Sequence, residues 1–284
     1  GQSGNLAPAD KKLYALRDVT ATVESLPLIA ASIMSKKLAA GSKNIVLDVK
    51  YGSGAFMKTV EQAEELATEM VKIGNGCGRK TAAVLTDMNV PLGHAVGNSL
   101  EIAEAVAVLR GENVSDLRQV CVCLAANMVS LTFDLPIEEA EKRVITAIDS
   151  GAAYEKMKEW ISAQGGDVRY IEDTSRFEKA SIIHEVKSPT DGYIHDMDAE
   201  GIGNASVVLG AGRLTKGDPI DFSAGIVIRG KAGDKVKKGD VLCELHTNNA
   251  DAVADAEKRY LNALVFGSEP PKKKPLIYKV VKGE

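Results

Sequence analysis

The sequence predicts an α/β domain with a mostly parallel sheet flanked by helices, followed by a smaller C-terminal α+β domain. Apolar runs that read as buried strands alternate with helical patterns, as they do in α/β proteins. From about residue 175, glycine, valine and turn dipeptides replace the long helical segments. The predicted domains are therefore 1–175 and 176–284.

The first predicted elements alternate between helix and strand. Residues 26–40 have helical spacing, and Gly41 is the stop. NIVLDVK (44–50) is a near-continuous apolar run, typical of a buried parallel strand. A helix over 59–73 begins with a Thr-x-x-Gln capping box, and a second strand follows at 81–88. This order indicates parallel strands with helices packed over them.

Additional helices are predicted over about 98–163. Asn98 is the expected N-cap of the first, with Glu101 completing a capping box and the helix running to about Leu109. The later helical segments are 115–132, 137–149 and 152–163. Beyond them, strands joined by Gly-Asp and Lys-Gly turns are followed by a short helix at 249–264 and a final strand, LIYKVV.

Composition excludes several classes of protein. The 284 residues carry a formal net charge of −4 and are 45% hydrophobic, which argues against a broad nucleic-acid-binding surface. No run of about 18 apolar residues is present, so we predict no membrane span. The cysteines show no CxxC pairing and the histidines no HExxH spacing. We expect buried free thiols and no histidine-based metal site.

Three candidate hydrogen-bond donors lie in the stretch from Leu16 to Gly41: Arg17, Ser32 and Lys36. On a helix Ser32 and Lys36 are one turn apart and share a face. Two interpretations are open from the residues alone. The lysine solvates the helix end and complements its dipole, or the three donors bind one ligand.

For two further motifs we prefer a structural interpretation to a functional one. YGSGAF (51–56) follows the first strand, where ligands bind in open α/β sheets, but its GxG pattern most simply indicates a tight turn. SPTDGYI and GDKVKKGDVLCEL look like the two halves of a biotinyl or lipoyl carrier domain. No Met-Lys-Met or Asp-Lys-Ala triplet lies between them, so we expect a barrel-sandwich-like scaffold without the prosthetic group. The non-enzyme alternative is a binding module built on that scaffold.

Long ordered segments of the chain resemble a known family. PADKKLYALRDVTATVESLPLIAASIMSKKLAA (8–40) is similar to the signature segment of thymidine and pyrimidine-nucleoside phosphorylases. VLDVKYGSGAFMK and LTDMNVPLGHAVGNSLEI resemble the next two blocks of that family in the same order. The resemblance continues through DGYIHDMDAEGIGNASVVLGAGR and GDKVKKGDVL, so it covers essentially the whole chain.

The resemblance implies an enzyme of nucleoside salvage. Such enzymes split pyrimidine nucleosides (uridine, thymidine, deoxyuridine) with phosphate as co-substrate and no organic cofactor, giving free base and ribose or deoxyribose 1-phosphate. The implied fold is a small helical domain, a large α/β domain and a C-terminal α+β domain, in a cytoplasmic homodimer. The tail LGAGRLTKGDPIDFSAG looks closer to the broad-specificity enzymes than to strict thymidine phosphorylases.

The resemblance assigns roles to the residues that spacing left open. Arg17, Ser32 and Lys36 match the family's base-binding residues and are the expected catalytic donors, because the leaving pyrimidine carries negative charge. Further expectations are an aromatic beside the base, two aliphatic side chains packed on it and a carboxylate ordering the network: Tyr14, Ile29, Ile33 and Asp10. A cation, K⁺ or Ca²⁺, is expected on the Leu92 and Ala95 carbonyls and the Glu104 carboxylate.

The sequence departs from the family at its start. Complete members have a longer N-terminal portion with a Lys-His-Ser loop and a glycine-rich segment that grip phosphate, and KHS is absent here. We therefore expect that the N-terminal portion of the same enzyme is missing and that residues 1–284 alone are inactive. The alternative enzyme hypothesis is a related nucleotide phosphorylase or phosphoribosyltransferase. The segment YALRDVTATV and the C-terminal domain argue against anthranilate phosphoribosyltransferase.

Overall fold

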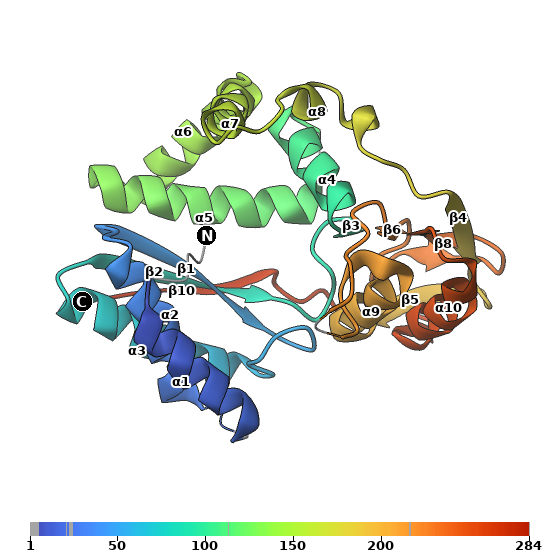
Figure 1. Ribbon diagram of the computed structural model, residues 1–284, viewed down its shortest axis with the longest axis horizontal. Coiled ribbons are helices and arrows are strands. Elements are labelled where there is room, and N and C mark those ends of the chain that lie inside the picture. The colour runs from blue at the N-terminus through green and yellow to red at the C-terminus, as the bar shows by residue number, and fades with distance from the viewer. Residues whose placement is uncertain (1–5, 21, 23–24, 113, 216, 284) are drawn as a thin grey trace. The chain divides into compact units, whose positions relative to one another are not determined.

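The computed structural model describes residues 6–20, 22, 25–112, 114–215 and 217–283 (Figure 1). Its contacts divide the chain into two compact units. Unit 1 consists of Gly1–Asp87, Val120–Val144 and Pro275–Glu284, and unit 2 of Met88–Gln119 and Ile145–Lys274. This division differs from the predicted boundary near residue 175, because the last strand of the chain pairs with a strand of unit 1.

Unit 1 is built on a three-stranded sheet with the order β1-β2-β10. β1 (Asn44–Tyr51) and β2 (Lys80–Asp87) are parallel and in register from end to end, as the apolar runs predict. β10 (Ile277–Lys282) joins β2 in the antiparallel direction. Among the described strands the β1–β2 pair is the parallel one and the other pairings between strands are antiparallel. The sequence predicts a mostly parallel sheet, but in the described part of the chain the parallel pairing is limited to one β-α-β crossover, from β1 through α3 to β2.

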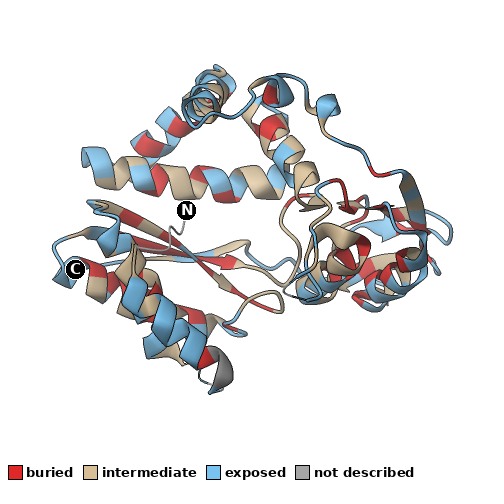
Figure 2. Ribbon diagram, viewed as in Figure 1, coloured by how far each residue is buried: buried red, intermediate tan, exposed pale blue. Residues whose placement is uncertain are grey.

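The crossover helix α3 (Val60–Gly76) connects the two parallel strands and packs on the sheet. Its capping box forms as predicted: Thr59 accepts the Gln62 N–H, and the Gln62 side chain accepts the Thr59 N–H. Buried apolar side chains of α3 meet those of β1 and β2. Figure 2 colours the ribbon of buried residues red. Full burial of a side chain such as Leu85 contributes roughly 2 kcal/mol.

Two short helices precede the sheet in the chain. They are α1 (Pro8–Val19) and α2 (Leu26–Ala39). Each has a proline in its first turn, where the missing N–H costs nothing. Gly41 has a φ of +77°, which lets the chain leave α2 and enter β1, in agreement with the predicted stop.

Two further helices, α5 (Ser115–Phe133) and α6 (Ile137–Asp149), contribute to both units. The end of α5 is fixed to the start of the sheet, where Asn44 donates to the Thr132 hydroxyl at 3.2 Å. Within the described parts of the chain, no single helix is both long and apolar enough to cross a membrane. These two pass that test only as a pair bent by 119°.

Unit 2 contains two antiparallel sheets, one with the order β3-β6-β8-β4 and one with the order β7-β5-β9. Its strands are β3 (Ala95–Gly97), β4 (Ile182–Lys187), β5 (Gly192–Met197), β6 (Gly225–Ile228), β7 (Lys235–Val236), β8 (Val241–Thr247) and β9 (Leu264–Gly267). Its helices, besides those shared with unit 1, are α4 (Ser99–Leu109), α7 (Ala152–Ala163), α8 (Arg169–Glu172), α9 (Ala199–Ser206) and α10 (Val253–Asn262). Short 3₁₀ helices are η1 (Thr174–Arg176) and η3 (Ala250–Ala252), and η2 (Val207–Ala211) is a short π-helical segment.

The core of unit 2 is formed by the inner faces of both sheets with α9 and α10, and includes fully buried Ile194, Ile226, Leu245 and Tyr260. This arrangement agrees with an α+β domain. The predicted capping box at Asn98 is wrong, since this side chain makes no cap hydrogen bond. Its amide instead donates to the Ala211 carbonyl at 2.9 Å.

The four cysteines are free, as expected, but three of them are not buried. Cys77 and Cys121 are exposed, Cys123 is intermediate and Cys243 is buried. Cys121 and Cys123 lie on α5, and side chains two residues apart on a helix point in different directions.

Candidate base-binding site

The predicted base-binding residues of unit 1 lie on the two helices that precede the sheet. Asp10 is on α1, and Ser32 and Lys36 are one turn apart on α2. The Lys36 Nζ lies 2.9 Å from Asp10 Oδ2 and donates to Ser32 Oγ at 3.0 Å. The structure therefore brings together a cation, a hydroxyl and a carboxylate. Helical spacing predicts that the cation and the hydroxyl, Lys36 and Ser32, are neighbours.

This cluster is shielded from solvent to different degrees. Ser32 is buried, with 7% of its surface exposed. The side chains of Asp10 and Lys36 are 12% and 22% exposed. Partial burial acts to raise the pKa of the Asp10 carboxyl, but hydrogen bonds from Lys36 and Ser32 and the charges of Lys36 and Arg17 outweigh it and hold the pKa below its ordinary value. Asp10 is thus an anion at neutral pH and keeps Lys36 in place.

Lys36 has hydrogen-bonding capacity beyond these two partners. An ammonium group has three N–H donors, and within the described part of the chain two are accounted for, by Asp10 and Ser32. One donor of a fixed ammonium is therefore left for a ligand. A positioned N–H of this kind stabilises negative charge that develops on a bound group.

Arg17 is also predicted to bind the base, and the structure buries it to 6% exposure. Its guanidinium donates to the Thr22 carbonyl at 3.3 Å and to the Leu28 carbonyl at 3.2 Å. It also lies over the Tyr14 ring, 5.3 Å from the ring centroid, as a cation–π contact. These contacts fasten the end of α1 to the start of α2, so Arg17 positions the two helices that carry the cluster.

The three apolar residues expected around the base differ in their surroundings. Ile29 is 9% exposed and belongs to the core of unit 1. Ile33 is half-buried against the same core, and Tyr14 is 40% exposed. Ile33 and Tyr14 therefore keep surface available for a ligand, whereas Ile29 mainly holds α2 against the core of unit 1.

A polar cluster at the ends of the parallel strands was missed by the sequence analysis. Lys50 on β1 lies 2.7 Å from Asp48 Oδ2 and donates to the Thr86 hydroxyl of β2 at 2.9 Å, and this hydroxyl donates to Asp48. Thr86 is fully buried. The signal was present in the sequence, because two charged residues spaced by two must share one face of a strand.

The geometry of unit 2 does not support the predicted cation site. Both oxygens of the Glu104 carboxylate accept backbone N–H groups, from His94 at 2.7 Å and Ala95 at 3.2 Å. The cation that the carbonyls of this loop hold is the ammonium of Lys231, to which the Gly93 carbonyl is an acceptor at 2.6 Å. The described residues also contain no group of three or more His, Cys, Asp or Glu side chains suited to a metal ion.

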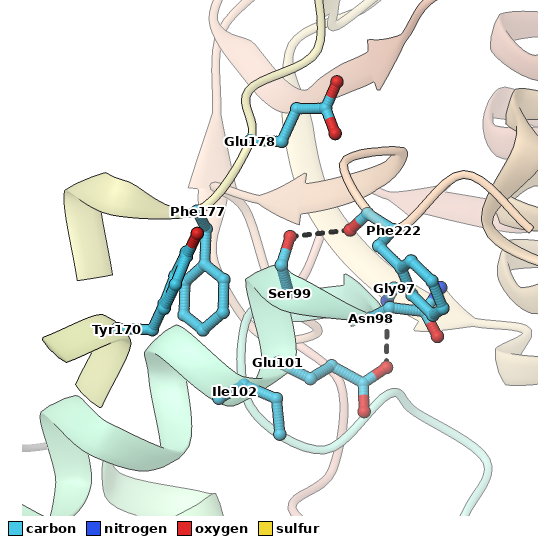
Figure 3. A pocket seen from close by; sticks show the side chains of 9 residues that line it. All are labelled: Gly97, Asn98, Ser99, Glu101, Ile102, Tyr170, Phe177, Glu178 and Phe222. Atoms are coloured by element: carbon cyan, nitrogen blue, oxygen red, sulfur yellow. Dashed lines mark hydrogen bonds between the residues drawn. The ribbon is translucent and has the colours of Figure 1, made fainter. Parts of the chain in front are cut away.

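Unit 2 also contains an open cavity of about 660 Å³, shown in Figure 3. Its apolar wall includes Phe222, which is 66% exposed, and the rings of Tyr170 and Phe177, 5.5 Å apart. The polar groups at its edge are paired internally: Ser99 donates to the Phe222 carbonyl at 2.6 Å, and Glu101 accepts the N–H of Gly97. None of the predicted base-binding residues lines it, and it has no fixed cationic donor to match that of Lys36. We therefore place the candidate site at the helix pair of unit 1.

Comparisons with known proteins match both parts of the chain. Residues 1–154 match the family model described as glycosyl transferase family, a/b domain. Residues 193–267 match the model described as pyrimidine nucleoside phosphorylase C-terminal domain. Similar curated proteins, each called pyrimidine-nucleoside phosphorylase, come from Staphylococcus aureus strains bovine RF122 / ET3-1, USA300 and NCTC 8325 / PS 47. Each is 51% identical over 282 residues, covering 99% of this chain and 65% of the relative's length.

Proposed function

Because the chain belongs to the pyrimidine-nucleoside phosphorylase family of glycosyl transferases, we propose that its activity is the phosphorolysis of pyrimidine nucleosides. The proposed substrates are uridine, thymidine and deoxyuridine with inorganic phosphate, and the products are the free base and ribose or deoxyribose 1-phosphate. The proposal includes a homodimeric assembly in the cytoplasm, which rests on the family resemblance.

The observation that carries the proposal is the fixed ammonium of Lys36 with its remaining donor. In the reaction a phosphate oxygen forms a bond to C1′ of the sugar while the bond from C1′ to the base nitrogen breaks. The electron pair of the broken bond goes to the pyrimidine, whose ring and carbonyl oxygens then carry negative charge. Lys36 is charged and held by Asp10 before the reaction, so it stabilises that charge without reorganising.

The other residues of the cluster orient the base and the donor. The Ser32 hydroxyl accepts from Lys36 and donates to Asp10, so it has one lone pair left to accept the imide N–H of the pyrimidine. Arg17 is rigid and fully charged, so it adds positive potential at the junction of the helices. Ile33 and Tyr14 supply apolar surface against the ring, which lowers the local dielectric and strengthens the polar contacts.

The test is product analysis with the full-length protein that carries this sequence. Uridine, thymidine and deoxyuridine are incubated separately with inorganic phosphate, and free base and pentose 1-phosphate are quantified by chromatography. We expect equal amounts of the two products, formed only when phosphate is present. Guanosine is the control, because a purine does not present the pyrimidine carbonyl pattern to Ser32 and Lys36.

Two results would contradict the proposal. The first is release of the base at the same rate without phosphate, which would indicate hydrolysis. The second is no consumption of any pyrimidine nucleoside by folded protein.

A further inference from the structure

The open cavity of unit 2 has aromatic walls on two sides. Tyr170 of α8 and Phe177, which follows η1, form one wall, with their ring centroids 5.5 Å apart. Phe222, in the loop before β6, forms the other, and Ser99 at the start of α4 lies between the two walls (Figure 3). Phe222 is 66% exposed and Tyr170 is 41% exposed. Aromatic rings exposed to this extent are stabilised when a partner covers them.

The charged residues that line this cavity are both acidic. They are Glu101 and Glu178, and both are exposed. Glu101 accepts the Gly97 N–H at 2.9 Å with one of its carboxylate oxygens, which leaves the other oxygen open. Neither glutamate has an ion-pair partner within the described part of the chain. The cavity therefore fits an occupant that combines apolar surface with positive charge.

The chain has an exposed segment of that chemistry between β9 and β10. Residues 270–274 have the sequence PPKKK, and Pro275 follows directly. These residues form neither helix nor strand, and all of the lysines among them are exposed. Among the described residues, these lysines make no ion pair. Because proline fixes φ near −65°, the segment favours the extended polyproline II conformation.

Aromatic grooves with acidic edges suit segments of this kind. A proline-rich segment docks on aromatic side chains with little loss of entropy, because its conformation exists before binding. Lysine ammonium groups are attracted both by carboxylates and by the faces of aromatic rings. The cavity volume of about 660 Å³ lies within the usual range for binding pockets. No hydrogen bond or ion pair joins 270–274 to the cavity within the described residues of unit 2, so the matching segment comes from another copy.

We propose that the cavity lined by Tyr170, Phe177 and Phe222 binds residues 270–274 of a second copy of this chain, with prolines against the rings and lysines beside Glu101 and Glu178. The contact is small, so it is weak and depends on ionic strength. The proposal follows from unit 2 alone. It depends neither on the enzymatic activity nor on the surface that forms the proposed homodimer.

The first test measures the binding of a dye-labelled peptide by fluorescence anisotropy. The peptide is SEPPKKKPL, which is the sequence of residues 268–276. The receptor is the full-length protein with Lys272→Ala, Lys273→Ala and Lys274→Ala, so that its own segment does not compete. We expect a Kd on the order of 10 to 100 µM at low ionic strength. A peptide with glutamine in place of each lysine should bind at least about ten-fold more weakly, because the charge complementarity is lost.

Substitutions in the cavity locate the binding site. Phe222→Ala in the receptor should weaken binding by about ten-fold or more, because it removes one aromatic wall. Glu178→Gln should weaken it by about two- to five-fold, as expected for an exposed ion pair. Trp160→Ala, which removes a 58% exposed ring of α7, and Glu112→Gln, which removes an exposed charge, are matched controls that should leave the Kd unchanged. Circular dichroism checks that each variant is folded.

The second test measures association of the protein itself by sedimentation velocity over a range of concentrations. The average sedimentation coefficient of the wild type should rise more steeply with concentration than that of the triple lysine variant. Excess unlabelled peptide should remove the difference, because it occupies the cavity.

Three outcomes would overturn the proposal. One is no binding of the peptide by the folded receptor. Another is a Kd that Phe222→Ala leaves unchanged or that Trp160→Ala raises equally, because the peptide would then bind elsewhere. The third is identical sedimentation of the wild type and the triple lysine variant at every concentration, which would exclude a second copy as the occupant.

Discussion

Replacement of Lys36 by methionine tests the role of the ammonium while the apolar stem is kept. Lys36 donates to Ser32 and pairs with Asp10, and we propose that its remaining N–H binds the base. A hydrogen bond from a charged donor contributes about 1.5 to 3 kcal/mol, which corresponds to a loss of roughly 10- to 150-fold in kcat/KM. We expect a loss in this range for phosphorolysis of uridine, measured on the full-length protein by the absorbance change on base release.

The same substitution has a separate effect on stability. It leaves the Asp10 carboxylate, 12% exposed, without its ammonium partner. At a separation of 2.9 Å the attraction is about 6 kcal/mol at an effective dielectric of 20, most of which desolvation offsets. We therefore expect a net cost of about 1 to 2 kcal/mol. The double variant Asp10→Asn/Lys36→Met removes the unpaired charge and should recover much of that stability.

These two effects make the prediction refutable. The double variant should regain stability and stay impaired in kcat/KM, because the donor that we propose for the base is still missing. Lys37→Met, an exposed neighbour on the same helix, is the matched control and should have wild-type kcat/KM. If Lys36→Met retains kcat/KM within about two-fold of wild type, or if the double variant regains activity together with stability, Lys36 is a structural partner of Asp10 only.

Three further predictions concern stability. Folding lowers the pKa of Asp10, so its contribution to the free energy of unfolding is complete above the ordinary aspartate pKa and is lost as the pH falls below about 4. The Tm difference between wild type and Asp10→Asn should therefore be constant from neutral pH down to about pH 5 and should shrink below pH 5. Thr59→Ala removes one half of the α3 capping box and should cost about 1 kcal/mol in urea unfolding, whereas Thr59→Ser should cost much less. Gly225→Ala places a Cβ atom 2.4 Å from the Val96 carbonyl oxygen and should lower the free energy of unfolding by roughly 2 to 4 kcal/mol. A Tm equal to that of the wild type would show that β3 and β6 separate easily.

Sequence reasoning predicted those elements whose cause is local. The strand predicted at 44–50 follows from a near-continuous apolar run, and the helix at 137–149 follows from helical spacing. The capping box at Thr59 follows from residue types three apart. β3 was missed, because it has three residues and exists through pairing with β6, more than a hundred residues later. The capping box at Asn98 failed for a similar reason, since a distant carbonyl took the asparagine amide.

The candidate site was predictable in part. The proximity of Ser32 and Lys36 follows from helical spacing, and the structure shows that contact. The proximity of Asp10 to Lys36 depends on how α1 packs on α2, which sequence spacing does not predict. Asp10 was included in the candidate site because of the family resemblance. The family resemblance also suggested a cation near Glu104, but it could not reveal that a lysine of this chain lies among the loop oxygens.

The pairing of β10 with β2 has a consequence for the order of events during synthesis. Ile277 pairs with Thr86, so the two partners are separated by roughly 190 residues of chain. Translation adds about 5 to 20 residues per second, so β10 is synthesised on the order of 10 to 40 s after β2. During that interval an apolar strand edge is open to other chains, a known route to aggregation. A chaperone that holds nascent chains would therefore protect β2, and a truncation that removes β10 would make that exposure permanent.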